Sequence, residues 1–340
     1  MRILIALGLY VSLTSSGFGQ DVRQKQIAEF LKAGDYNSAE RSLREGLAEQ
    51  PANAAGANDL RVALGDLLRE EGKNAEAGEL FRTALKSPDI LWKRRLSATM
   101  GLAGIEGQEV SRQAGADRWT EAISIARAHR DEDPTSEADA LRGLAVMWLE
   151  AGDPSSAEPL LKRSLKILET EPSAAGWQLA STLAATGQVY RSQGKLALAE
   201  NAWMRALDID RKMFGDAHPQ VAYLMERLAE VYAERNQFDL ARRYAGQALG
   251  TMRSCCGEDS LAFAAALANR GLIEEYEKAL PAAADDYASA LAIARKHPNN
   301  PTLLIRIIRN YTAVLRAIHH DREAKALALE LKSFRQQNPR

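Results

Sequence analysis

The sequence predicts an all-α fold of stacked helical hairpins, because it repeats itself every 42 residues between Leu141 and Leu291. The repeat is visible in four columns of small residues and leucines: Ala157, Ala199, Ala241, Ala283; Ala145, Gly187, Ala229, Gly271; Ser164, Ala206, Ala248, Ala290; and Leu165, Leu207, Leu249, Leu291. A repeat of this length indicates stacked supersecondary units and not a single globular core.

Composition supports the same fold class and limits the partners. The chain of 340 residues is 46% hydrophobic and has only 11 prolines, which favours helices and one continuous solenoid domain. Lys and Arg number 44 and Asp and Glu number 45, so the chain has no field that would attract nucleic acid or an anionic membrane. Both kinds of partner are therefore disfavoured.

Residues 1–19 are predicted to be a secretory signal peptide. Met1-Arg2 supplies a charge, Ile3 to Leu13 is an apolar run, and Gly17-Phe18-Gly19 places small residues where a signal peptidase cuts. Cleavage is expected after Gly19. An uncleaved anchor is the alternative, but a spanning helix needs roughly 20 apolar residues, more than this run offers. No Cys follows the run to carry a lipid, so we expect a periplasmic or secreted protein without membrane insertion.

The solenoid is predicted over residues 20–336 as about eight hairpins, with regular repeats over 138–296. In each hairpin two amphipathic segments flank a turn, and the turns contain Gly34, Gly72, Gly152, Gly194, Asn236, Lys278 and Asp321. Gly and Asn suit the left-handed position that ends a helix, whereas Lys278 is a weaker stop that Pro281 assists. One hairpin, near residues 91–131, is degenerate. It fits the pattern only if about ten residues from Gln108 to Ala116 are an insertion.

The pattern of Leu64, Gly65, Leu68, Gly72, Ala77, Phe81 and Ala84 resembles the tetratricopeptide repeat. The 42-residue step and the motif from Gly215 to Ala222 are similar to the longer repeats of kinesin light chains. This resemblance implies a right-handed α-solenoid. It also implies a concave face, lined by the first helix of each hairpin, that binds a peptide or another protein.

The exposed stripe of the first helices supplies the candidate partner-binding residues. They are Gln188, Arg191, Glu226, Arg227, Glu230, Asn269, Leu272, Arg309, Asn310 and Arg316. In the kinesin-like repeats an Asn on the first helix binds the backbone of an extended peptide, and Asn269 and Asn310 match that place. Glu226 and Glu230 lie one turn apart and repel each other unless a cation faces them. The alternative for any one of these residues is an ordinary solvated helix face.

Residues that could carry chemistry are sparse. The five histidines, His129, His218, His297, His319 and His320, do not pair with Cys or carboxylates at metal-ligand spacing. No phosphate-binding loop or nucleophile elbow is present, so we predict no catalytic residues, no metal and no cofactor. Cys255-Cys256 leaves three alternatives open: a vicinal disulfide, a bond between chains, or buried free thiols.

Two functions are consistent with the sequence. The first is a non-catalytic, exported interaction scaffold that binds a peptide or protein in its concave groove. The second is a structural or self-associating spacer in a cell-envelope assembly. An enzyme is disfavoured because no catalytic constellation is found.

Overall fold

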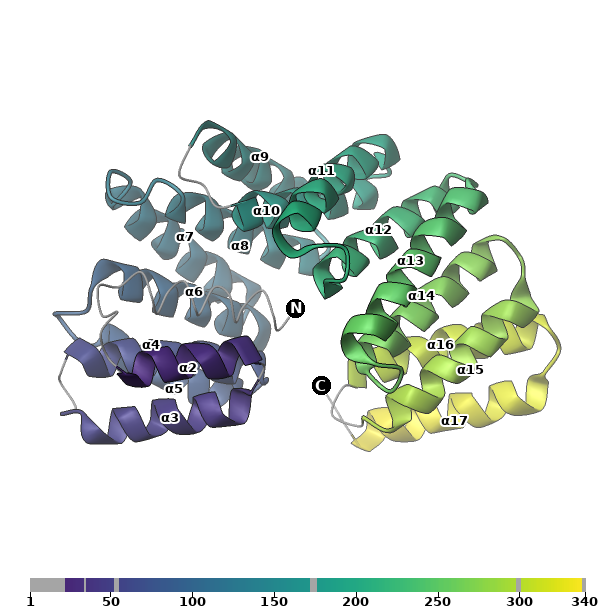
Figure 1. Cartoon of the computed structure of the whole chain (residues 1–340), viewed down its shortest axis with the longest axis horizontal. Helices are drawn as coiled ribbons and strands as arrows, with labels where there is room; N and C mark the ends of the chain where they lie inside the picture. The colour runs from purple at the N-terminus through teal and green to yellow at the C-terminus, as the bar shows by residue number, and fades with distance from the viewer. Residues whose placement is uncertain (1–21, 34, 52–54, 172–175, 298–300, 338–340) are drawn as a thin grey trace. The chain divides into compact units, whose positions relative to one another are not determined.

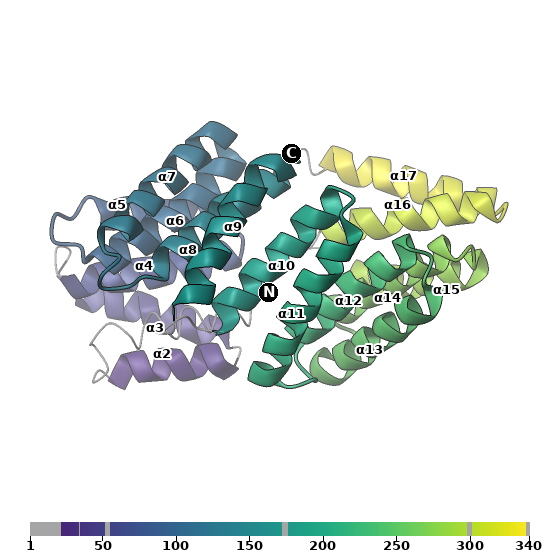
Figure 2. The same ribbon diagram turned by 90° about the horizontal axis from the view of Figure 1, so that it is seen from above.

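The computed structural model describes residues 22–337 except 34, 52–54, 172–175 and 298–300, and the described residues form sixteen α-helices without a strand. The predicted signal peptide lies outside the described residues. Consecutive helices pack as eight antiparallel hairpins, which confirms the all-α solenoid of about eight hairpins. Figure 1 shows them in chain order, and Figure 2 shows the same arrangement from above.

The hairpins fall into two compact units of four, divided between residues 174 and 175. Unit 1 contains α2 (Val22–Ala33), α3 (Tyr36–Glu49), α4 (Ala55–Glu70), α5 (Asn74–Leu85), α6 (Trp92–Glu109), α7 (Arg112–Ala128), α8 (Ser136–Glu150) and α9 (Pro154–Thr170). Unit 2 contains α10 (Gly176–Ser192), α11 (Leu196–Phe214), α12 (Pro219–Glu234), α13 (Phe238–Cys256), α14 (Leu261–Tyr276), α15 (Leu280–Arg295), α16 (Pro301–Ala317) and α17 (Asp321–Gln337). Even-numbered helices are the first helices of their hairpins.

The turns inside the hairpins share one backbone conformation. The second residue after the first helix takes a positive φ, at Gly72, Gly152, Gly194, Asn236, Lys278 and His319. The next residue donates its backbone N–H to a carbonyl five positions earlier, as from Lys195 to Tyr190 at 2.8 Å. This is the bond that closes a helix C-terminus around a left-handed residue. The predicted stops at Gly194, Asn236 and Lys278 are therefore confirmed, and Lys278 adopts the conformation without the freedom of glycine.

Close helix packing in several hairpins depends on an aromatic ring lying over a glycine. Phe81, Trp203 and Tyr287 of the second helices contact Gly65, Gly187 and Gly271 of the first, each glycine being 16 positions earlier. A Cβ at Gly187 would lie 2.5 Å from Trp203 Nε1, closer than any real contact. The Trp203 indole also donates to the Ala184 carbonyl at 2.9 Å. Gly187 and Gly271, two members of one column of the 42-residue lattice, therefore mark places where a ring meets a helix backbone.

The hairpin predicted to contain an insertion has none. Helix α6 continues to Glu109 and α7 begins at Arg112, so only two residues separate them. Gly107 and Gly115 lie where the two helices cross, since a Cβ at Gly115 would be 2.6 Å from the Gly107 Cα. The segment predicted to be an insertion instead forms the end of α6 and the start of α7, and Gly107 and Gly115 allow the two helices to approach.

Candidate functional site

The candidate site is the surface that α10, α12, α14 and α16 share, here called the first-helix face of unit 2. Helix α12 contacts α14 directly, and α14 contacts α16. Hydrogen bonds and ion pairs also join α10 to α12 and α12 to α14. This face corresponds to the predicted concave face, because neighbouring first helices line it.

Charged side chains from α10 and α12 form a continuous cluster on this face. Arg191 of α10 pairs with Glu230 and with Glu234 of α12, the latter at 2.6 Å. Arg227 of α12 lies 2.5 Å from the other Glu230 oxygen and 4.0 Å from Glu226. Two guanidinium groups therefore face the carboxylates that the sequence places one turn apart. This arrangement satisfies the condition under which adjacent glutamates are tolerated.

Glu226 is the most constrained member of the cluster. One of its oxygens accepts a hydrogen bond from the Asn269 amide of α14 at 2.7 Å, and its Oε1 is buried without a hydrogen-bond partner among the described residues. Burial raises the pKa of Glu226 to about 7, and the nearby Arg227 only partly opposes the rise. Burial also lowers the pKa of Arg306 on α16, with a contribution from Arg227.

Two tyrosines remain exposed beside the cluster, Tyr223 at 41% and Tyr276 at 43%. The Arg227 guanidinium lies 5.2 Å from the centre of the Tyr223 ring, within the range of a cation–π contact. Burial raises the pKa of the Tyr276 hydroxyl, and the adjacent Glu234 carboxylate adds to the rise. The first-helix face therefore combines an ordered ionic centre with aromatic rings open to solvent.

Comparison with known proteins decides the family. Tetratricopeptide-repeat models match residues 26–92 and 178–254, one segment in each unit. The chain is a tetratricopeptide-repeat protein. Its repeats are of the kinesin-light-chain kind, as the sequence predicted.

A curated relative supports this assignment. The tetratricopeptide-repeat chain is 27% identical over 128 residues to the protein Kinesin Light Chain-Related 1 of Arabidopsis thaliana. The match covers 37% of this chain and 20% of the relative, so the chain spans about a fifth of that protein's length.

Solved structures show the same fold. BtubC (BKLC) from P. vanneervenii is 23% identical, with a TM-score of 0.56 over 66% of this chain and 93% of its own. A Rap protein complexed with Competence and Sporulation Factor is 13% identical, with a TM-score of 0.65 over 97% of this chain and 87% of its own. The tetratricopeptide-repeat fold suggests a protein–protein interaction scaffold.

The predicted partner-binding residues differ in their exposure. Arg309 and Arg316 are exposed, as expected, and the half-buried ones are Gln188, Arg191, Arg227, Leu272 and Asn310. Glu226, Glu230 and Asn269 are not on an exposed stripe, because they are only 6%, 3% and 5% exposed. They lie between neighbouring first helices, where Asn269 binds Glu226 and Glu230 pairs with two arginines.

Asn310 lies beside the Tyr287 hydroxyl, which donates its hydrogen bond to Glu275. Asn269 reaches a peptide only if its internal bond to Glu226 is exchanged. Sequence reasoning missed Tyr223, Tyr276, Glu234 and Arg306, although Tyr223 and Arg227 stand four positions apart on one helix.

Cys255 and Cys256 lie at the end of α13, with their sulfurs 2.7 Å apart and no bond between them in the structure. Cys255 is exposed and Cys256 half-buried, so the prediction of buried thiols is wrong, and a disulfide stays a prediction. Partial burial of the sulfur and its contact with Cys256 raise the pKa of the Cys255 thiol to about 12.

Two further searches covered the part of the chain that the structure describes. No group of three or more His, Cys, Asp or Glu side chains there is arranged to hold a metal ion. No helix within the same residues has the length and apolar character to cross a membrane.

Proposed function

We propose that the protein is a non-catalytic scaffold that binds a peptide or protein segment on the first-helix face of unit 2. The observation that carries this proposal is the pair of exposed tyrosines, Tyr223 and Tyr276, beside the ordered cluster of Arg191, Arg227 and Glu230. Tyr and Arg are the residues that most often dominate binding energy at protein interfaces. The complex of the related Rap fold with Competence and Sporulation Factor supports a partner of this class.

The cluster contributes to binding mainly by fixing positions. Because Arg191 and Arg227 are each held by carboxylates, their guanidinium planes and the Tyr223 ring lose little freedom when a partner docks. The exposed Arg309 and Arg316 on α16 extend the face with positive charge. A partner segment with acidic and aromatic or aliphatic side chains fits this combination.

The experiment is a capture comparison. Tagged parent protein and the double variant Tyr223→Ala/Tyr276→Ala are each incubated with extract and with secreted protein of the source cells. The double variant is expected to lose the captured partner, since truncating an interface tyrosine costs roughly 2 kcal/mol, or about 30-fold in affinity. Leu198→Ala, at an exposed apolar residue of α11, is the matched control and should retain it. Equal capture by all three proteins contradicts the proposal.

Export is a second part of the proposal. It is supported by the charged start, the apolar run and the small residues before Gln20, all in the sequence. We expect a periplasmic or secreted protein whose first residue is Gln20. Intact-mass measurement of the protein recovered outside the cytoplasm tests this, and a mass that includes residues 1–19 contradicts it.

The alternative is a self-associating spacer of a cell-envelope assembly, in which the first-helix face binds a second copy. Light scattering coupled to size-exclusion chromatography separates the two. A monomer across the micromolar range supports the scaffold. A dimer that dissociates in the Tyr223→Ala/Tyr276→Ala variant supports the spacer.

A further inference from the structure

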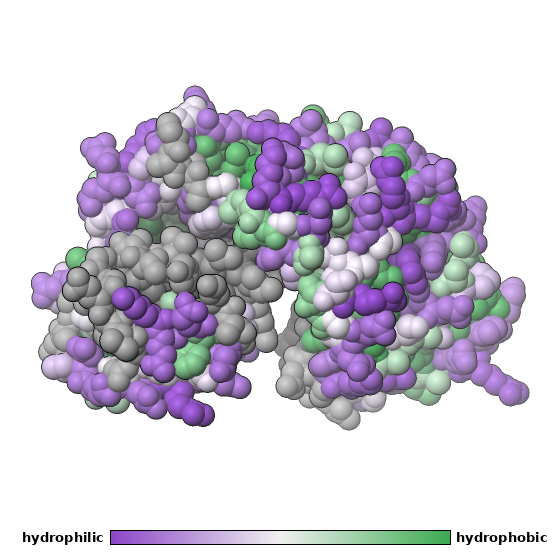
Figure 3. All heavy atoms as spheres, in the orientation of Figure 1, coloured by the Kyte–Doolittle hydropathy of each residue, from purple (hydrophilic) through white to green (hydrophobic). Residues whose placement is uncertain are grey.

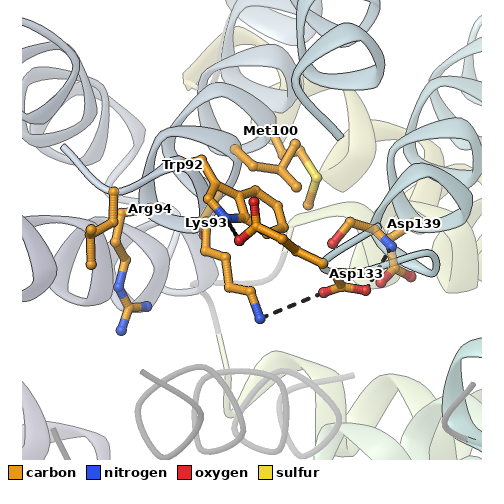
Figure 4. A pocket seen from close by; sticks show the side chains of 11 residues that line it. Trp92, Lys93, Arg94, Met100, Asp133 and Asp139 are labelled. Atoms are coloured by element: carbon orange, nitrogen blue, oxygen red, sulfur yellow. Dashed lines mark hydrogen bonds and ion pairs between the residues drawn. The ribbon is translucent and has the colours of Figure 1, made fainter. Parts of the chain in front are cut away.

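The charged side chains that line the pocket of unit 1 each have a partner inside that unit. This pocket has a volume of about 460 Å³ and lies between the start of α6 and the start of α8. Lys93 lies 3.8 Å from Asp133 there, as Figure 4 shows, and Arg94 is buried against Asp59 of α4 at 2.8 Å. A charge that is withdrawn from water without such a partner is costly, so it calls for a physical reason.

Helix α16 of unit 2 carries a charge of this kind. Its residues, Pro301–Ala317, include Arg306, Arg309 and Arg316 and no Asp or Glu. Within the part of the chain that the structure describes, none of the three arginines forms a hydrogen bond or an ion pair. Arg309 and Arg316 are exposed, so water solvates them, whereas Arg306 is half-buried. The unpaired charge of Arg306 is therefore the costly one.

Arg306 faces the ionic cluster of the first-helix face without joining it. Burial and the charge of Arg227 lower the pKa of Arg306 by more than the nearby carboxylates of Glu226 and Glu230 raise it. Both carboxylates are engaged elsewhere, because Glu226 binds Asn269 and Glu230 pairs with two other arginines. The protein's own anions therefore leave the charge of Arg306 only partly compensated.

Two buried polar atoms of the residues that face Arg306 also lack a hydrogen-bond partner among the described residues. They are Oε1 of Glu226, a residue that is only 6% exposed, and Nε of Arg227. Burial raises the pKa of Glu226 to about 7, so at neutral pH its carboxyl is protonated in about half of the molecules and supplies little negative charge. A group that brings negative charge and accepts hydrogen bonds fits this place.

We propose that Arg306 binds a carboxylate group of the partner segment that docks on the first-helix face of unit 2. This inference rests on the function proposed above and adds the residue and the chemical group that fix the position of the segment. A planar carboxylate matches the fork of one guanidinium through two parallel hydrogen bonds. A phosphate dianion or a polyanion is disfavoured, because Glu230 and Glu234 border the site and would repel the additional charge.

The binding test follows the arginine Nε signals of the isotope-labelled full chain by NMR, and Arg306→Gln identifies the signal of Arg306. Acetyl-glutamate-amide is the probe with a side-chain carboxylate, and acetyl-glutamine-amide is its neutral control of nearly the same shape. Acetyl-glycine presents the carboxylate of a chain terminus. We expect a saturable shift of the Arg306 signal with a carboxylate and little shift with the glutamine derivative. The carboxylate that binds more tightly indicates whether the segment offers a side chain or its terminus.

Three variants extend the test to the captured partner. Arg306→Gln should weaken its binding about tenfold, and Arg306→Lys, which keeps the charge without the fork, should weaken it less. Arg322→Gln, at an exposed arginine of α17, is the matched control and should bind as the parent does. Because Arg306→Gln removes a half-buried charge without an ion pair, its melting temperature should not fall below that of the parent.

The outcomes separate this inference from the function on which it rests. If Tyr223→Ala/Tyr276→Ala loses the partner and Arg306→Gln retains it, the scaffold function stands and the carboxylate inference is wrong. If Arg306→Gln loses the partner and the tyrosine variant retains it, the carboxylate site stands and the docking surface built on the tyrosines is wrong. No shift of Arg306 with either carboxylate, or equal shifts with the glutamine control, also overturns the inference.

Discussion

At the scale of single residues, Glu226 shows how the first-helix face of unit 2 can be ordered at the cost of stability. Burial raises its pKa to about 7, well above the ordinary 4.5. The folded protein therefore holds a proton between about pH 4.5 and 7 that the unfolded chain has released. Stability contributed by this group is complete at acidic pH and decreases as the pH rises toward 7.

Glu226→Gln tests this reasoning, because glutamine keeps the shape and an oxygen for the Asn269 amide. At pH 8 the variant should be more stable than the parent by about 1 to 3 kcal/mol, whereas at pH 4.5 the two should be nearly equal. Urea unfolding at pH 4.5, 6 and 8 measures the difference. A difference that does not change with pH would mean that Glu226 stays ionised in the folded state.

Lys278 offers a second prediction for a single residue. Its φ of 63° is left-handed, and a side chain there is strained. Lys278→Gly should raise the unfolding free energy by about 1 kcal/mol. Gly194 occupies the equivalent position two hairpins earlier, and Gly194→Ala should lower the unfolding free energy by a similar amount. A Cβ at Gly194 meets nothing within 4 Å, so conformation alone is tested. Thermal melts of both variants check the opposite signs.

The residue scale is also where sequence reasoning was weakest. Helical periodicity placed Glu226, Glu230 and Asn269 on the first helices, and the structure has them there. Periodicity cannot say how closely the next first helix approaches, so it assigned them to solvent although they are buried. Their pairing partners come from helices about 40 positions away, as with Asn269 and Glu226, and no local pattern contains that information.

At the scale of helices and hairpins, the sequence was far more informative. Gly and Asn in the turns, and prolines such as Pro219 and Pro281 in the first turn of a helix, correctly predicted most boundaries. The exception was the junction of α6 and α7, where about ten residues from Gln108 to Ala116, Gly115 among them, were predicted to be an insertion. The sequence alone does not distinguish a glycine that ends a helix from one that lies within a helix and allows a neighbouring helix to approach.

Ion pairs between neighbouring hairpins are a second feature that the structure shows and the sequence did not predict. In unit 2, Arg235 pairs with Glu200, Arg242 with Glu277 and Arg295 with Glu330, each pair 35 positions apart. Figure 3 shows mostly hydrophilic side chains over the visible surface of α13, α15 and α17. Exposed pairs of this kind contribute about 0 to 1 kcal/mol each, so they fix register more than they stabilise.

The ring-over-glycine contact predicts the effect of one methyl group. Gly187→Ala would place a Cβ 2.5 Å from the Trp203 indole and force the α10–α11 hairpin apart. Overpacking of this kind costs about 1 to 3 kcal/mol. Gly246→Ala is the control, because that glycine lies within α13 with nothing within 4 Å, and alanine there should stabilise by about 0.5 to 1 kcal/mol. Equal melting shifts in the two variants would rule out the contact as the cause.

At the scale of the whole molecule, each hairpin buries its apolar surface only on its neighbours, as in other repeat arrays. Exposed side chains of the first helices do not take part in this packing. Substituting them should therefore alter partner binding without unfolding the chain. Arg309 is such a residue, being exposed and without an ion pair among the residues the structure describes. Arg322 on α17 of the same hairpin is exposed in the same way but belongs to a second helix.

The comparison of Arg309→Glu with Arg322→Glu therefore tests which side of the array binds the partner. Arg309→Glu should weaken binding of a captured partner, and the loss should shrink at higher salt because charge repulsion between exposed groups is screened. Its melting temperature should stay close to that of the parent, since no packing contact is lost. Titration calorimetry of both variants at low and high salt measures this. If Arg322→Glu abolishes binding while Arg309→Glu binds as the parent does, the partner docks on the second helices and the first-helix face is structural.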